Sequence, residues 1–125
     1  MARPASQLLT DREVEIMSIL WELGPSTSQQ IGDRLTGQPH GSTVRTLLRI
    51  LASKGHVKVN NRVRPAIFSP AMKQRSVRKK AAAELLKRFF GGSAEELVLH
   101  LLDDERLSAE QLKELEQRFL NRTQE

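Results

Sequence analysis

The first half of the chain contains three stretches in which apolar residues recur at helical spacing. The first stretch begins after Thr10, whose side chain fits a capping box with that of Glu13, and it stops at Gly24-Pro25. Its apolar positions share one face, namely Ile16, Ile19, Leu20 and Leu23, with Met17 and Trp21 beside them. We interpret Trp21 as a core residue and not as a platform for stacking a base, because a single tryptophan on an apolar helix face is usually packed inside.

A short second helix is expected after this turn. Ser26 or Thr27 can cap its N-terminus, and the helix continues through Ile31 and Leu35. It ends at the loop of residues 36–41, which contains two glycines and a proline and therefore separates this helix from the next one.

A third helix is expected to open at Ser42 and to end at Lys54-Gly55. One face carries an apolar stripe, which consists of Val44, Leu47, Leu48 and Leu51. The opposite face is polar, because residues at positions i, i+3, i+4 and i+7 project from one side of a helix. Its members are Ser42, Arg45, Thr46 and Arg49, with Thr43 at the edge.

This polar face carries side chains that are suited to reading DNA. Arginine can pair bidentately with O6 and N7 of guanine, and threonine offers a hydroxyl and a methyl group to thymine. A serine at a helix N-terminus can bond to phosphate. We therefore predict that the face contacts DNA through Ser42, Thr43, Arg45, Thr46 and Arg49. The alternative is an ordinary solvent-exposed face.

Two short strands joined by a basic loop follow the third helix. Residues 56–59 alternate like a strand, and residues 66–69 can return antiparallel to them. Three helices followed by a basic hairpin predict a winged helix-turn-helix, in which Arg62 and Arg64 lie near backbone phosphate. In the alternative interpretation, these two arginines protect an edge strand from aggregation.

The chain from Pro70 onward is expected to be wholly helical, over about residues 71–90, 94–102 and 109–121. These helices are too few to close a core alone, so we predict that they pair with a second copy in a homodimer. The apolar side chains assigned to that interface are Leu85, Phe89, Leu97, Leu101, Leu112, Leu115 and Phe119. The alternative is a monomer in which these helices fold back onto the winged helix.

Charge is unevenly distributed along the chain. Residues 1–80 carry a net charge of +9, and residues 81–125 carry −4. The basic part indicates a polyanionic partner such as nucleic acid, because each phosphate neutralised releases condensed counterions; a solvated basic surface is the alternative. The basic run after the wing adds electrostatic support and not base readout: Lys73, Arg75, Arg78, Lys79 and Lys80.

The predicted fold class is mainly α. Residues 1–70 are expected to form an N-terminal winged helix-turn-helix of three helices plus a β-hairpin wing, and to be the DNA-binding domain. Residues 71–125 are expected to form the helical C-terminal dimerisation domain.

Composition removes several other function classes. The chain has no cysteine, which excludes disulfides, thiolate metal sites and thiol chemistry and suits a reducing cytoplasm. It lacks any run of about 18 apolar residues, and residues 1–7 lack a secretory signal, so we expect a cytoplasmic protein without a membrane partner. There is no G-x-S-x-G, P-loop or HExxH pattern, and His40, His56 and His100 are scattered. We therefore expect no enzyme activity, no cofactor and no metal site.

The order of motifs resembles that of the BlaI/MecI/CopY penicillinase-repressor family of bacterial winged-helix regulators. The resemblance extends over nearly the whole chain, through LTDREVEIMSILWELGPSTSQQI, STVRTLLRILASKGHVKV, FSPAM, FFGGSAEELVLHLL and LSAEQLKELEQ. It implies a repressor that dimerises through its C-terminal helices and binds inverted repeats resembling TACA and TGTA. On the matching positions it implies DNA contacts by Ser42, Thr43, Arg45 and Thr46. The DNA contacts predicted for Arg49 and for the wing residues Arg62 and Arg64 rest only on their expected positions on the helix face and in the loop.

The chain departs from this family pattern at two points. Members that repress resistance genes are cleaved by a partner membrane-sensor protease at an Asn-Phe bond, which aligns here with His100-Leu101. The resemblance thus implies a sensor protease as a partner, but the scissile pair is absent, and another protease or a ligand is the alternative. Copper-responsive members carry a C-terminal cysteine motif, which this chain lacks, so copper sensing through thiolates is excluded.

Together, these features predict a transcriptional repressor that binds a palindromic double-stranded DNA operator as a homodimer, with the third helix in the major groove. One alternative is a winged-helix adaptor that binds proteins, since winged helices do not all bind DNA. Another is a nonspecific DNA-binding protein, which would bind an operator and a scrambled duplex with equal affinity.

Overall fold

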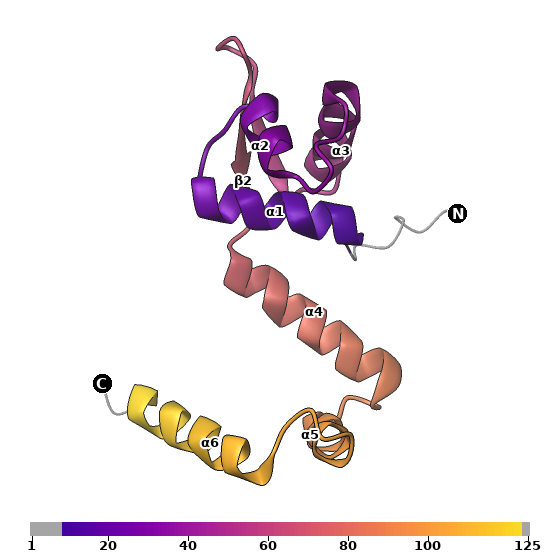
Figure 1. Ribbon diagram of the computed structural model, residues 1–125, viewed down its shortest axis with the longest axis vertical. Coiled ribbons are helices and arrows are strands. Elements are labelled where there is room, and N and C mark those ends of the chain that lie inside the picture. The colour runs from indigo at the N-terminus through magenta and orange to yellow at the C-terminus, as the bar shows by residue number, and fades with distance from the viewer. Residues whose placement is uncertain (1–8, 124–125) are drawn as a thin grey trace. The chain divides into compact units, whose positions relative to one another are not determined.

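The computed structural model describes residues 9–123. Residues 1–8, which include the segment expected to lack a secretory signal, and residues 124–125 lie outside the described part. The described chain contains six helices and one two-stranded sheet (Figure 1). It divides into two compact units between Lys79 and Lys80, and each unit is described by itself below.

Helix α1 (Asp11–Leu23) begins and ends where the sequence predicts. Oγ1 of Thr10 accepts a hydrogen bond from the Glu13 N–H at 3.2 Å, and the Glu13 carboxylate accepts one from the Thr10 N–H at 2.8 Å, so the capping box is confirmed. The helix stops at Gly24, whose φ of 78° lies in the left-handed region that favours glycine. Its buried apolar side chains are Ile16, Met17, Ile19 and Leu20. Leu23 is exposed, against the prediction, because it is the last helical residue and extends past the core.

Helix α2 (Ser28–Arg34) packs against both α1 and α3 (Gly41–Ser53) (Figure 1). Thr27 is its cap, with Gln30 completing a second capping box. Helix α3 begins at Gly41, one residue before the predicted start at Ser42. The reason is that the His40 carbonyl already accepts the first helical bonds, from the N–H groups of residues 43 and 44, without any side-chain cap.

The core of this N-terminal unit forms where the apolar faces of α1, α2 and α3 meet. Besides the α1 residues, it buries Ile31, Leu35, Val44, Leu48, Leu51, Val57 and Phe68. Leu47 and Trp21 are half-buried and pack against this cluster. The Trp21 Nε1–H donates a hydrogen bond to the Met72 carbonyl at 2.9 Å, so the indole packs against the core and its polar atom is satisfied.

The hairpin is antiparallel, as predicted, and consists of β1 (Val57–Asn60) and β2 (Ile67–Pro70). Each strand starts one residue later than expected. The N–H of His56 bonds back to the Leu51 carbonyl in the turn that follows α3, so the strand begins only at Val57. Phe68 also exchanges two backbone hydrogen bonds with Ser26, which fixes β2 beside the turn between α1 and α2. The predicted mainly α fold with a winged helix is therefore confirmed.

Three helices follow, as predicted: α4 (Gln74–Phe89), α5 (Ala94–Asp103) and α6 (Ala109–Thr123). Helix α4 starts three residues later than expected, because the backbones of Ala71 and Met72 bond to His56 and Trp21. No residue of these three helices is buried. Among residues 9–123, no helix is both long enough and apolar enough to span a membrane.

Candidate nucleic-acid interface

The outward face of α3 carries all five residues of this helix that the sequence predicts to contact DNA. Ser42, Thr43, Arg45, Thr46 and Arg49 are all exposed. Burial of the stripe that contains Val44, Leu48 and Leu51 fixes this orientation, because an amphipathic helix that buries one face must turn the other to solvent.

Local hydrogen bonds determine which polar groups on this face are available. The Thr46 hydroxyl donates to the Ser42 carbonyl at 2.9 Å, which leaves its oxygen as an acceptor and its methyl group free of polar partners. Ser42 Oγ lies 3.2 Å from Nδ1 of His40. Within residues 9–123, neither Arg45 nor Arg49 forms an ion pair, so both guanidinium groups keep their donors for an external acceptor.

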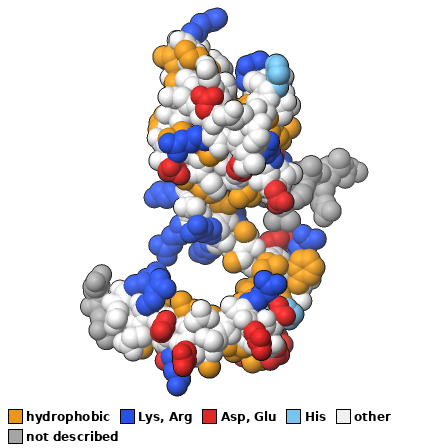
Figure 2. Space-filling model, in the orientation of Figure 1, with side chains coloured by type: hydrophobic (Ala, Val, Ile, Leu, Met, Phe, Trp, Pro, Cys, Tyr) orange, Lys and Arg blue, Asp and Glu red, His pale blue; other side chains and the backbone are white. Residues whose placement is uncertain are grey.

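The loop between β1 and β2 displays the other two predicted DNA-contacting residues. Arg62 and Arg64 are exposed, and neither takes part in an ion pair of the described chain. The Asn60 Oδ1 accepts a hydrogen bond from the Arg62 N–H at 3.0 Å, which orders the start of the loop. Lys and Arg side chains lie at the tip of this loop and beside the upper end of α3 in the view of Figure 2. The loop and α3 extend from the same side of α1 (Figure 1), so the N-terminal unit presents basic side chains from both of them on that side.

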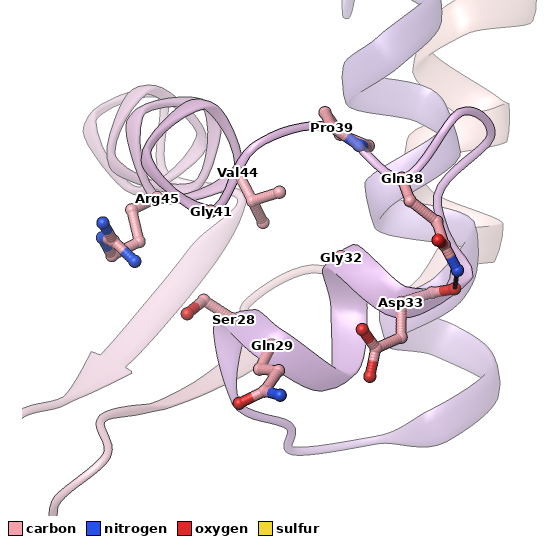
Figure 3. Close-up of a pocket in the computed structure, with 9 residues that line it drawn as sticks. All are labelled: Ser28, Gln29, Gly32, Asp33, Gln38, Pro39, Gly41, Val44 and Arg45. Carbon is pink, nitrogen blue, oxygen red and sulfur yellow. Dashed lines mark hydrogen bonds between the residues drawn. The ribbon is translucent and has the colours of Figure 1, made fainter.

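A hollow of about 310 Å³ lies between α2 and α3, beside Arg45. Ser28 and Gln29 of α2 line it together with Arg45 (Figure 3), and Gln38 in the connecting loop donates a hydrogen bond to the Asp33 carbonyl at 3.3 Å. Ser28 and Gln29 were not predicted as site residues, because only the apolar positions of α2 follow a helical pattern in the sequence. Their position beside Arg45 depends on how α2 crosses α3 near Gly32, which no local pattern in the sequence indicates.

Ile50 is a third residue of this surface that was not predicted. It is 40% exposed and lies four residues after Thr46, so it adds an apolar side chain to a face expected to be polar. Apolar side chains can contact the methyl group of thymine in the major groove. The face is therefore of mixed character, with arginine, threonine and isoleucine side by side.

Two carboxylates of α1 contact the segments on either side of α3. The buried Glu13 accepts hydrogen bonds from Lys54 Nζ at 2.8 and 3.1 Å. Burial raises the pKa of Glu13, but hydrogen bonds from Lys54 and from the Thr10 backbone outweigh it, and the net pKa is lowered. Hydrogen bonds from the Thr36 N–H and hydroxyl, with a further one from Arg12, lower the pKa of Glu15 to about 2.

Comparison with known proteins shows to which family the chain belongs. The family model described as penicillinase repressor matches residues 9–121. The chain belongs to the penicillinase repressor family. The penicillinase repressor of Bacillus licheniformis is 25% identical over 111 residues, which cover 87% of each chain. An uncharacterized 16.5 kDa protein in the ptsI 3' region of Latilactobacillus sakei is 27% identical over 113 residues, which cover 87% of this chain and 76% of the relative.

Membership in the penicillinase repressor family confirms the resemblance that the sequence motifs indicate. It supports a role in repressing transcription, and the described fold agrees with a DNA-binding winged helix. Among residues 9–123, no three His, Asp or Glu side chains are grouped to hold a metal ion, and the absence of a metal site stays a prediction.

In this chain, the residues predicted to form the dimer are accessible. Five of the side chains are exposed: Leu85, Phe89, Leu112, Leu115 and Phe119. Leu97 and Leu101 are half-buried. His100 and Leu101, which occupy the positions of the family's cleavage pair, lie inside helix α5, and the His100 ring meets that of Phe90 edge-on at 5.9 Å. A sensor protease as partner stays a prediction.

Proposed function

We propose that this member of the penicillinase repressor family binds a palindromic operator in double-stranded DNA as a homodimer and blocks transcription there. One observation carries the proposal: α3 buries its apolar stripe and displays arginine and threonine side chains without ion-pair partners on its outward face. Such a helix fits the major groove, where arginine and threonine read base edges. The wing arginines add phosphate contacts beside it. The proposal places the protein in the cytoplasm, with the DNA.

The C-terminal helices support the homodimer. Exposed apolar side chains occur along α4, α5 and α6, and none of their residues is buried. Figure 2 shows apolar side chains on the surface of this part of the chain. Exposed apolar side chains of this number are expected to be covered by a partner, and a second copy would supply a matching set. Two copies would present two α3 helices to the two halves of an inverted repeat.

Fluorescence anisotropy at near-physiological salt tests the proposal. The protein is titrated onto a duplex with paired TACA and TGTA half-sites, which family membership implies, and onto a scrambled duplex of equal length. We expect a preference of about 10³-fold or more for the operator, as specific DNA-binding proteins show. Equal affinity for a range of inverted-repeat and scrambled duplexes would favour a nonspecific DNA-binding protein. Absence of binding to all of them would favour the adaptor function.

A further inference from the structure

We propose that Glu13 and Glu15 of α1 are positioning residues for DNA recognition, because they hold the segments at the two ends of α3. The inference rests on the proposed function of α3 as the recognition helix. Neither carboxylate lies on the outward face of α3, so each would act through the segment that it contacts.

Glu13 holds the C-terminal end of α3. Lys54, the residue at which this helix ends, donates from Nζ to both carboxylate oxygens, at 2.8 and 3.1 Å. Only 3% of the Glu13 side chain and 20% of the Lys54 side chain are exposed. The Thr10 N–H also donates to the Glu13 carboxylate, so this carboxylate is held at the first turn of α1 independently of its bonds with Lys54. The end of α3 is therefore bonded to a rigid group.

Glu15 holds the segment that leads into the N-terminal end of α3. Its Oε2 accepts hydrogen bonds from the Thr36 N–H at 2.8 Å and from the Thr36 hydroxyl at 2.7 Å. Its Oε1 accepts a bond from Arg12 at 2.8 Å, so the carboxylate cannot turn away from Thr36 without losing a charged partner. The loop that starts at Thr36 enters α3 at Gly41.

We expect DNA recognition to need these directional hydrogen bonds, because the other contacts that keep α3 in place are largely apolar. Hydrophobic contacts are non-directional, so the buried stripe resists separation of the helix more than rotation or a slide along its axis. A recognition site must hold its side chains to within about 0.5 Å of the productive geometry. His40, the N-cap of α3, makes no side-chain capping hydrogen bond to the helix backbone; its Nδ1 lies 3.2 Å from the exposed Ser42 hydroxyl. The two carboxylates of α1 provide hydrogen bonds with defined directions, to Lys54 at the C-terminal end of α3 and to Thr36 at the start of the loop that leads into α3.

The charge change in each variant distinguishes a loss of positioning from a general electrostatic effect on DNA affinity, because the two effects have opposite signs. Glu13→Gln and Glu15→Gln each remove one negative charge, which by itself strengthens binding to DNA at any sequence. Loss of positioning does the opposite and weakens binding to the operator alone. Glu22→Gln is a control on the same helix with the same charge change, because the Glu22 side chain is 70% exposed and pairs with Arg34 of α2, and not with Lys54 or Thr36.

The experiment measures affinity for operator and scrambled duplexes for the wild-type protein and these variants. We expect Glu13→Gln and Glu15→Gln to bind the operator about tenfold more weakly, the size of coupling between charged residues in contact. Binding to the scrambled duplex should be unchanged or stronger. Glu22→Gln should keep the wild-type preference. If the Glu13 and Glu15 variants keep that preference as well, or if all three lose it equally, the proposal is overturned.

Lys54→Met provides a second variant with the opposite charge change. It should lose operator preference as Glu13→Gln does, although it lowers the net charge while Glu13→Gln raises it. Circular dichroism and thermal unfolding identify the temperature at which each variant is folded, and affinities are compared there. Should Glu13→Gln not fold, Glu15→Gln decides the outcome, since its carboxylate is 29% exposed. A wild-type protein without operator preference would refute the proposed function itself, whereas preference in every variant would refute the positioning role alone.

Discussion

At the scale of single residues, two sets of charged side chains in the N-terminal unit differ in their surroundings. Arg45, Arg49 and the two wing arginines are exposed and form no ion pair within residues 9–123. Glu13 and Glu15, by contrast, are saturated with hydrogen bonds. The first group is free to bind an external anion, and the second group stabilises the fold.

Arg45 is the residue at which base readout can be tested. Arg45→Ala should weaken operator binding by about 1 to 3 kcal/mol and relax the base preference at one position of each half-site, because a bidentate arginine is lost. Anisotropy with operators altered one base pair at a time measures both effects. Arg118→Ala on α6 makes the same charge change and should leave base preference intact. Equal losses on operator and scrambled duplexes would instead assign Arg45 to phosphate contact.

The lowered pKa of Glu15 predicts that the folded chain loses stability as the solution becomes acidic. Its pKa is about 2 in the folded chain against an ordinary value of 4.5, so the stabilisation is complete above about pH 4.5 and is lost as the pH falls toward 2. Urea unfolding of the wild type and of Glu15→Gln from pH 6 to pH 2 measures it. The difference in the free energy of unfolding between the wild type and Glu15→Gln should become smaller as the pH falls over this interval. It should change by more than the difference between the wild type and Glu22→Gln. A gap that stays constant down to pH 2 would contradict this origin.

At the scale of elements, the close crossing of α2 and α3 determines how α3 lies against the rest of the N-terminal unit. A Cβ atom added at Gly32 would lie 3.2 Å from Cγ2 of Val44, so the two helices approach at a distance that suits glycine. The same approach brings the side of α2 that carries Ser28 and Gln29 beside Arg45. Helix crossing and site geometry therefore depend on one contact.

The crossing can be tested with Gly32→Ala in two backgrounds. In the wild type, overpacking against Val44 should cost about 1 to 3 kcal/mol and offset or exceed the gain of about 1 kcal/mol from higher helix propensity. With Val44→Ala the methyl group is gone, so Gly32→Ala should stabilise by about 1 kcal/mol. Urea unfolding of the four proteins gives the coupling. Equal effects of Gly32→Ala in both backgrounds would show that the contact is not limiting.

At the scale of the whole molecule, the two units differ in what stabilises them. The N-terminal unit has a buried core contributed by three helices and the hairpin. In α4, α5 and α6 no residue is buried, and large apolar side chains such as Phe89 and Phe119 are 67% and 59% exposed. Helices of this length gain most of their stability from packing, so the second unit needs an apolar partner surface.

Phe119→Glu tests whether a second copy supplies that surface. A charge buried in an apolar interface is costly, so we expect the dimer to dissociate at protein concentrations at least about tenfold higher than for the wild type. Sedimentation velocity over a concentration series measures this, and operator affinity should fall with it. Gln117→Glu introduces the same group at an exposed polar position of α6 and serves as control. If Phe119→Glu sediments as the wild type does, that residue lies outside any dimer interface.

The sequence by itself determined the local structure of this protein. The capping boxes at Thr10 and Thr27 and the caps at Ser93 and Ser108 join residues three positions apart, so the pattern of side chains suffices to predict them. The apolar stripe of α3 likewise predicted which side of that helix would face outward. These features depend on helical period and short-range hydrogen bonds alone.

Only the tertiary structure decided how those elements meet. Lys54 and Glu13 are 41 residues apart, Thr36 and Glu15 are 21 apart, and Trp21 and Met72 are 51 apart. A charged or polar residue in the sequence does not indicate which distant group it will contact, because that depends on how helices cross and how far each side chain reaches. For the same reason the exposure of Ile50 and the position of Gln29 beside Arg45 had no local signal that distinguished them from ordinary core and surface positions.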